Sequence, residues 1–251
     1  MAKCSNCGGK GFIIKENDMG EEEASPCKCW IQLNKDARLE SKLIEANLNQ
    51  KYTKYVFEDY LKQSFNQAIK IFNQPQVDIL KNFIENPNEF MESIQTLWIW
   101  GKDPNAGHTT LATILGIALI KAGYKVRFFR MQSLLDIFYE FDKKSAFFEN
   151  IKKFDVYIVD DAFVTDRSIV NGQYIKTHLF NFIDMSLGED KHFIMTSDRL
   201  VNDISSEFEQ IKVIMMRSLL ELELRGSIIK TTSEHKTSLT SNIQLNKFGK
   251  E

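Results

Sequence analysis

Short apolar runs that end in polar residues alternate with helical segments through most of this 251-residue chain. The runs cover residues 96–100, 126–129, 156–159 and 193–196. Helical segments lie between them, the clearest at 109–122, which closes at a glycine. Strands that are covered on both faces are continuously apolar, and strands separated by helices pair in parallel. The pattern therefore predicts an α/β fold in which a parallel sheet is flanked by helices.

Polar clusters follow three of these predicted strands, at residues 101–110, 160–161 and 196–198. The carboxyl ends of parallel strands meet at one edge of a sheet, where open α/β sheets bind their ligands. We therefore expect the three clusters to form one site.

The first cluster lies between a strand and a helix, where a phosphate-binding P-loop would be. It differs from the usual G-x4-G-K-[ST] by one extra residue between the glycines and by His108 in place of lysine. Amide groups at a helix N-terminus still favour a phosphate, and a protonated His108 or Lys102 could supply the missing charge. A plain strand–helix connection is the alternative. The residues expected to contact nucleotide are Gly101, Lys102, Asn105, Gly107, His108, Thr109, Thr110 and Asp160.

The second cluster, Asp160-Asp161, fits a Walker B element. Asp160 would hold Mg²⁺ through water, and Asp161 would orient or deprotonate the attacking water. The alternative is that these are ordinary acidic residues at the end of a parallel strand. In the third cluster, a polar side chain could contact the γ-phosphate or the water, although a carboxylate at Asp198 would repel the nucleotide unless a metal intervenes.

An apolar segment at 211–224 is predicted to be helical and contains Arg217. This arginine could reach the γ-phosphate on a neighbouring subunit, as arginine fingers do, or it could be an ordinary surface residue.

All four cysteines lie within the first 29 residues, in the pattern C-x2-C-x19-C-x-C. Glycines at 8, 9 and 11 permit the tight turn by which two thiolates approach one ion. Cys4, Cys7, Cys27 and Cys29 therefore predict a structural zinc site with no open coordination position. Two disulfides or a redox CxxC pair are the alternatives.

The chain is predicted to have three parts: a zinc-binding module with a linking helix at 1–46, a larger core at 47–226, and a last strand and tail at 227–251. Within the module, 12–14 is expected to be a strand, 21–23 a hairpin tip and 30–46 a helix. A possible last strand lies at 228–229.

Composition excludes a disordered or fibrous chain, since 43% of residues are hydrophobic and 26% are charged. No apolar window approaches the length of a membrane span and no secretory signal is visible, so a cytoplasmic location without a membrane partner is expected. The net charge of −2 provides no global field for nucleic acid. Locally, Arg127 and Arg130 flank Phe128-Phe129, which could contact single-stranded DNA or belong to the core.

In this order, the elements resemble the DnaC/DnaI-type replicative helicase loaders, AAA+ proteins of bacteria and their phages, whose phage-type members carry a Cys-rich zinc module. The resemblance covers about residues 4–226. It is carried by Cys4-x2-Cys7-Gly8-Gly9-x-Gly11, Pro26-Cys27-Lys28-Cys29, and the segments 46–52, 57–60, 97–112, 156–163 and 193–200, up to the arginine at 217.

This resemblance implies an AAA+ P-loop-type ATPase core that binds ATP or ADP with Mg²⁺ between subunits of a homo-oligomer. It implies contact with single-stranded DNA and delivery of a replicative helicase, which the N-terminal module holds. It assigns zinc to the four cysteines, phosphate to Gly107 and His108, and Mg²⁺ to Thr109. Catalytic roles would fall on Asp161 in Walker B, Asp198 at sensor 1 and Arg217 as the finger.

The chain departs from this family on the γ-phosphate side of the site. It has the extra loop residue, His108 for lysine and Asp198 where asparagine is common, and it has no arginine beyond Arg225 for sensor 2. These departures predict weak or absent ATP hydrolysis. The alternatives are a non-hydrolysing AAA+-fold adaptor or inhibitor of the helicase, and an IstB-type transposition helper, which would generally lack the zinc module.

Overall fold

The computed structural model describes residues 4–17, 19–48, 53, 57–58, 60, 74–103, 106–163, 173–224 and 245–246. The chain divides into two compact units, residues 1–45 and residues 46–251.

The first unit is a β-hairpin followed by a helix. Strand β1 (Phe12–Glu16) pairs antiparallel with β2 (Glu22–Pro26), and helix α1 covers Lys28–Glu45. Asn17 makes the turn, because its side-chain oxygen accepts the N–H groups of Met19 and Glu21. The hairpin tip predicted at 21–23 is therefore misplaced, since β2 already begins at Glu22.

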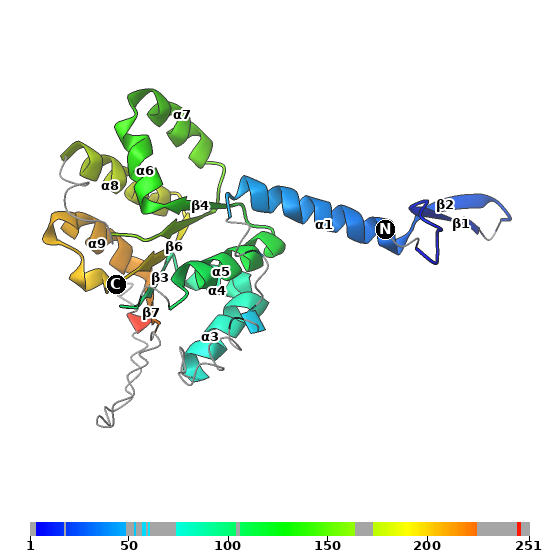
Figure 1. Cartoon of the computed structure of the whole chain (residues 1–251), viewed down its shortest axis with the longest axis horizontal. Helices are drawn as coiled ribbons and strands as arrows, with labels where there is room; N and C mark the ends of the chain where they lie inside the picture. Colours follow the sequence, from blue (N-terminus) through cyan, green and yellow to red (C-terminus); the bar gives the residue numbers. More distant parts are fainter. Residues whose placement is uncertain are drawn as a thin grey trace. The chain divides into compact units, whose positions relative to one another are not determined.

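The second unit contains a sheet in the order β4-β5-β6-β3-β7-β8 (Figure 1). The first five strands pair in parallel, and β8 joins β7 antiparallel. The strands are β3 (Thr96–Trp100), β4 (Val126–Arg130), β5 (Val156–Asp160), β6 (His192–Ser197), β7 (Leu219–Glu223) and β8 (Leu245–Asn246). The predicted parallel sheet is confirmed.

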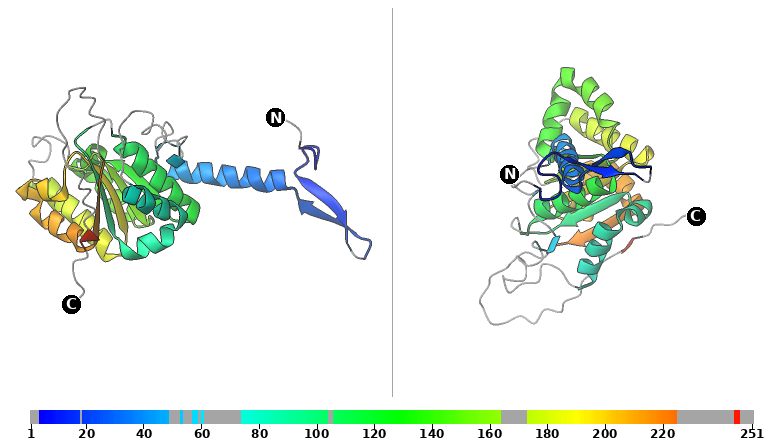
Figure 2. Two further views of the ribbon diagram at one scale, coloured as in Figure 1. Left: turned by 90° about the horizontal axis from the view of Figure 1, so that it is seen from below. Right: turned by 90° about the vertical axis from the view of Figure 1, so that its right-hand side faces the viewer.

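Helices cover both faces of this sheet (Figure 2). On one face lie α3 (Gln74–Glu85), α4 (Pro87–Ser93) and α5 (His108–Ala122). On the other lie α6 (Met131–Tyr139), α8 (Gln173–Gly188) and α9 (Glu209–Met215), with α7 (Phe141–Ile151) against α6. Single 3-10 turns, η1 (Val201–Asp203), η2 (Ser206–Phe208) and η3 (Met216–Ser218), lie near α9.

The helix predicted over 211–224 is wrong beyond Met215, because the chain turns through η3 and enters β7. In β7, Leu220 and Leu222 are buried and alternate with the partly exposed Glu221 and Glu223. This period of two is typical of a strand, and pairing with β3 overrides the helix propensity of leucine and glutamate.

No helix within the described ranges is both long enough and apolar enough to cross a membrane. The tail predicted at 227–251 lies outside the described residues except for β8, and so does the strand predicted at 228–229.

Candidate functional site

The alternation of side chains along β5 and β6 selects which residues lie under helix α5. Ile158 is close to α5, since a Cβ on Gly116 would lie 2.6 Å from its Cδ1. Asp160 follows two residues later and shares that face. On β6, Met195 belongs to the core of the opposite face, which places Thr196 on the α5 face beside Asp160.

Three segments meet at the carboxylate of Asp160. The hydroxyl of Thr109, in the first turn of α5, donates to both Asp160 oxygens at 2.9 Å. The hydroxyl of Thr196 donates to Asp160 Oδ1 at 2.6 Å and accepts the backbone N–H of Asp161 at 3.0 Å. The polar clusters after β3 and β5 thus meet, and the third contributes through Thr196.

The Asp160 carboxyl is 1% exposed. Burial raises its pKa, while the hydrogen bonds from Thr196 and Thr109 act against this shift. Removal from water makes its negative charge costly, so a cation here would be strongly favoured. A carboxylate beside a threonine hydroxyl offers the oxygen ligands that Mg²⁺ prefers, so these residues fit the metal expected with a nucleotide.

The start of helix α5 is a candidate site for an anion. Gly107 is the N-cap of α5 in the left-handed region (φ 84°, ψ 27°), and its carbonyl accepts the N–H of Leu111. The first N–H groups of a helix have no partner within the helix and can bind a phosphate. Lys102 is exposed, Thr110 is half-buried, and Asn105 lies outside the described residues.

His108 occupies the position of the P-loop lysine. Its Nε2 atom is enclosed and makes no hydrogen bond to any residue in the described ranges. Burial lowers the pKa of His108, whereas the charges of Asp161, Asp103 and Asp198 act in the opposite direction. A lowered pKa favours the neutral imidazole, so His108 does not supply the permanent positive charge of a lysine.

Gly101 is confined by its neighbours. A Cβ at this position would lie 2.3 Å from the carbonyl oxygen of Leu224 and 2.8 Å from His108 Nε2. The close approach of the loop to the end of β7 thus requires glycine.

Asp198, predicted at the sensor-1 position, is held by its neighbour Arg199. Arg199 Nε lies 2.6 Å from Asp198 Oδ1, and Nη2 lies 2.9 Å from Oδ2. Because both carboxylate oxygens accept from one guanidinium, much of the repulsion expected toward a nucleotide is neutralised. The sequence analysis did not identify Arg199, and its adjacency to an unusual aspartate was the available signal.

Arg217 is exposed in η3, immediately before β7. Leu219 of β7 pairs with Thr96, the first residue of β3, so Arg217 lies at the amino edge of the sheet. The five residues of β3 separate this edge from the phosphate loop by about 15 Å. Arg217 is therefore too distant for the phosphates in its own subunit's site.

The aromatic residues proposed for DNA stacking belong to the core. Phe128 and Phe129 are both buried, and Arg127 lies over the rings of Phe129 and Phe154 at 5.6 and 5.7 Å. The alternative reading, a core strand flanked by arginines, is confirmed. The pair Phe128-Phe129 is not a stacking platform for bases.

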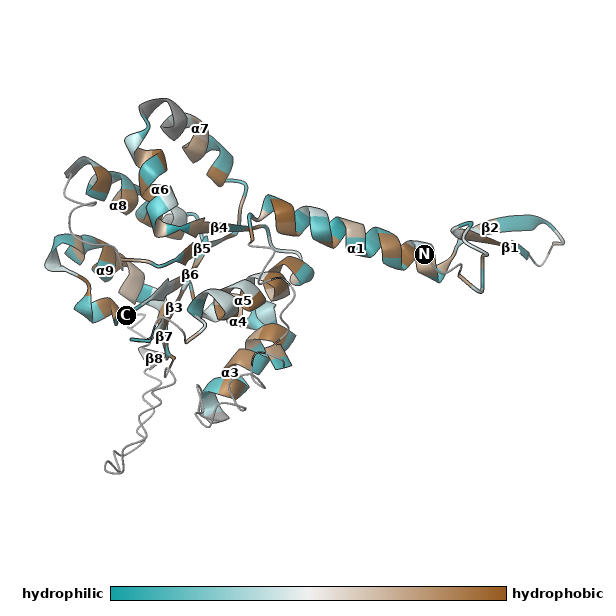
Figure 3. Ribbon diagram, in the orientation of Figure 1, coloured by the Kyte–Doolittle hydropathy of each residue, from teal (hydrophilic) through white to brown (hydrophobic). Residues whose placement is uncertain are grey.

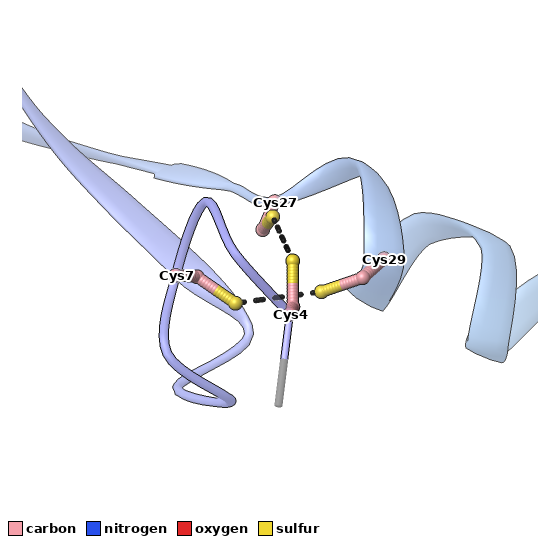
Figure 4. Close-up of side chains that lie close together, drawn as sticks. All are labelled: Cys4, Cys7, Cys27 and Cys29. Carbon is pink, nitrogen blue, oxygen red and sulfur yellow. Dashed lines mark hydrogen bonds between the residues drawn. The ribbon is translucent and has the colours of Figure 1, made fainter. Parts of the chain in front are cut away.

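The four cysteines of the first unit converge on one point (Figure 4). Their sulfur atoms all lie within 4.8 Å of one another. The Sγ atoms of Cys7 and Cys29 lie 3.4 Å apart, and those of Cys4 and Cys27 lie 3.8 Å apart. Zinc bonds of about 2.3 Å in a tetrahedron place sulfurs about 3.8 Å apart, so the arrangement fits one tetrahedral ion.

The turn after Cys7 supports a metal site rather than disulfides. All four thiols are free, and Gly8, Gly9 and Gly11 have φ values of 60°, 90° and 83°. The N–H of Gly11 donates to Cys7 Sγ at 3.4 Å and is the main cause that lowers the pKa of Cys7 to about 6. A thiolate is the form that binds metal, so this cluster could hold an ion.

Tyr60 is a second residue that the sequence analysis did not assign to the site. Its hydroxyl donates to the carbonyl of Ala106 at 3.1 Å and lies 3.4 Å from that of Gly107. It precedes the loop by more than 40 residues, so no local pattern could have connected the two.

The chain matches the protein family described as "IstB-like ATP binding protein" over residues 34–234. No curated protein matches it. Among solved structures, it resembles a replication initiator DnaA bound to AMPPCP and single-stranded DNA, with 20% identity and a TM-score of 0.54, covering 70% of this chain and 50% of that one.

Two further structures share this fold. DnaI matches with 14% identity and a TM-score of 0.51, covering 70% of this chain and 94% of that one. AMPPCP-bound DnaA from Aquifex aeolicus matches with 18% identity and a TM-score of 0.50, covering 61% and 46%. The chain spans about half the length of the DnaA structures. The larger unit thus has the AAA+ fold, a five-stranded parallel sheet flanked by helices.

Proposed function

The chain belongs to the family of IstB-like ATP binding proteins, and we propose that it is a helicase loader in DNA replication whose AAA+ unit acts as a nucleotide switch. ATP or ADP with Mg²⁺ would bind at the carboxyl edge of the sheet. The protein would then hold a replicative helicase and contact single-stranded DNA as part of a homo-oligomer.

The observation that carries this proposal is the contact of Thr109 and Thr196 with the buried Asp160 carboxylate. Thr109 lies in the first turn of helix α5, which follows β3, and Asp160 ends β5, which is separated from β3 by β6 in the sheet. The fold brings these two side chains within hydrogen-bond distance. Thr109 and Asp160 would hold Mg²⁺ there, and the ion would supply positive charge to a phosphate bound at the start of the helix.

Each residue of the site then has a defined task. The N–H groups of Gly107, His108 and Thr109 bind phosphate oxygens, and Thr109 and Asp160 hold Mg²⁺, which neutralises phosphate charge. Asp161 orients the attacking water. Arg217 is too far from the phosphate loop of its own subunit, so any role in catalysis would be at the site of a neighbouring subunit.

Hydrolysis is proposed to be weak or lost, so that nucleotide mainly controls assembly. Burial lowers the pKa of His108 and its Nε2 is enclosed, and the guanidinium of Arg199 is already engaged by both carboxylate oxygens of Asp198. Neither group supplies new positive charge as the transition state develops. ATP turnover at a rate normal for AAA+ proteins, with DNA and helicase present, would contradict this part of the proposal.

The cysteine cluster is proposed to bind Zn²⁺ and to fold the module that holds the helicase. Four thiolates complete a tetrahedral shell and leave no position for a substrate, so the ion would be structural.

Contact with single-stranded DNA is supported by the similar DnaA structure, which is bound to single-stranded DNA. The residues that contact DNA would lie elsewhere than Phe128-Phe129.

Nucleotide binding can be tested with a fluorescent ATP analogue and Asp160→Ala. We expect a loss of affinity of about 10- to 100-fold, as for other residues that support a bound metal. Asp155→Ala is a matched control, because Asp155 directly precedes the same strand and its carboxylate accepts the N–H of Lys125 at 2.9 Å, away from Thr109 and Thr196. Equal affinities of the Asp160→Ala and Asp155→Ala variants would refute the proposed site.

The helicase partnership requires a direct pull-down of the replicative helicase by the full chain. Capture that is lost in Cys27→Ser, while the larger unit remains folded, would assign the partner to the cysteine module. No capture by the wild-type chain would reject the loader function.

The family match also supports a second candidate, a transposition helper of the IstB type. The cysteine module argues against it, since such helpers generally lack one. A non-hydrolysing adaptor or inhibitor of the helicase, which would have lost the use of nucleotide, is distinguished by the ATP-analogue experiment, because neither the wild-type chain nor Asp160→Ala would then bind the analogue.

A further inference from the structure

Tyr60 lies against the phosphate loop although it is far from it in sequence. Its side chain is buried, and its hydroxyl donates to the carbonyl oxygen of Ala106 at 3.1 Å and, more weakly, to that of Gly107 at 3.4 Å. Ala106 is also buried. Its carbonyl therefore relies on protein donors rather than on bulk water.

The ring of Tyr60 also lies against Gly107, a loop residue that has no side chain. A Cβ on Gly107 would lie 2.9 Å from Tyr60 Cε2 and 3.1 Å from its hydroxyl oxygen. With φ at 84°, Gly107 has both the backbone conformation and the close approach that require glycine.

The Tyr60 hydrogen bond also determines where the next N–H group points. In a trans peptide the C=O and the N–H point in opposite directions. Because the carbonyl of Ala106 faces Tyr60, the N–H of Gly107 is directed away from Tyr60. This N–H is one of the three proposed to bind phosphate.

The orientation of the 106–107 peptide is easily lost because residue 107 is a glycine. Gly107 can adopt positive or negative φ at little cost, so the peptide between residues 106 and 107 can rotate unless something holds it. The tyrosine hydroxyl is suited to the task, since burial raises its pKa and it remains a donor at all physiological pH values.

We propose that Tyr60 is a positioning residue for nucleotide binding, which fixes the 106–107 peptide so that the N–H of Gly107 is presented to a phosphate. This inference rests on the proposed nucleotide site. In the free protein, loss of the hydrogen bond lets the loop populate other conformations, and affinity falls in proportion to the fraction that remains competent.

Tyr60→Phe tests the proposal, with Tyr157→Phe as the matched control. Tyr157 is equally buried, and its hydroxyl donates to the carbonyl of Ile151 at 2.9 Å, far from the loop. Each variant loses a buried tyrosine hydroxyl, so both should lose similar thermal stability. Only Tyr60→Phe should bind ATP and ADP about two- to tenfold more weakly.

Amide hydrogen exchange of Ala106 in the nucleotide-free protein provides a readout that needs no ligand, because the N–H of Ala106 donates to the carbonyl of Asp103 at 3.0 Å and is protected only while the loop keeps this conformation. We expect faster exchange in Tyr60→Phe than in Tyr157→Phe. Wild-type exchange and wild-type affinity in Tyr60→Phe would overturn the role of Tyr60 alone. Failure of the wild-type chain to bind any nucleotide would refute the proposed function, and faster exchange would then still establish that Tyr60 holds the loop.

Discussion

The two units of this chain differ in how many apolar side chains they bury. In the first unit, the only buried hydrophobic residues within the described ranges are Cys7 and Cys27, and α1 has no buried side chain at all. Figure 3 shows hydrophilic and hydrophobic residues alternating along α1. The larger unit instead buries whole strands and helix faces, with Trp98 and Phe182 completely enclosed.

This difference shows that the hairpin has little apolar burial to offset the entropy of ordering its backbone. Convergence of four sulfurs suits it to folding by metal coordination, whereas the larger unit folds by apolar burial. The two units should therefore respond to different perturbations, and the following experiments separate them.

Removal of the metal should have the largest effect. With a strong chelator or in Cys27→Ser, we expect the β1–β2 hairpin to lose its structure, because the proposed zinc coordination would take the place of a core there. Amide exchange of residues 12–26 should become fast while the unfolding transition of the larger unit stays in place. A hairpin that remains protected after chelation would show that the comparison is mistaken.

A cavity in the core of the larger unit should have the next largest effect on stability. It should destabilise the larger unit and leave the cysteine module unchanged. Phe182 is enclosed and contacts the rings of Tyr157 and Phe193 at 5.2 and 5.6 Å between centroids. Phe182→Ala should cost about 3–5 kcal/mol in urea unfolding of the larger unit. Zinc content and exchange in the hairpin should not change, and a concurrent loss of metal would indicate that the units are coupled.

The smallest effect is expected for an apolar side chain of the hairpin. Ile14 is 55% exposed in β1, and its replacement by threonine keeps a β-branched residue in the strand. Ile14→Thr should change the stability of the metal-bound module by less than about 0.5 kcal/mol, as measured by the chelator concentration needed to unfold it. A large loss would mean that apolar contact contributes more to this unit than the burial indicates.

Much of the candidate site could be predicted because it follows from periodicity. Asp160 ends an apolar run, and Thr109 begins a helix after a glycine-containing loop, so a parallel sheet brings both to one edge. The cysteine spacing likewise predicted convergence without any knowledge of the hairpin register. The roles of Asp161 and Arg217 remain predictions.

Other parts could not be predicted because they depend on partners distant in sequence. The segment Leu219–Glu223 has residues that suit either a helix or a strand, and its pairing with β3 selects the strand. Thr196 meets the Asp160 carboxylate only because β5 and β6 pair side by side, although 36 residues separate the two in sequence. Tyr60 acquires its role only through contact with the loop.

The sequence by itself determined the parallel sheet, the edge at which its polar residues gather and the set of four cysteines. Periodicity and spacing are local properties, and each restricts the backbone to few arrangements. Tertiary structure alone decided that Nε2 of His108 is enclosed, that Thr196 shares Asp160 with Thr109, and that the hydroxyl of Tyr60 contacts the loop. Burial and hydrogen-bond geometry depend on which distant segments come together, and only the folded chain specifies that.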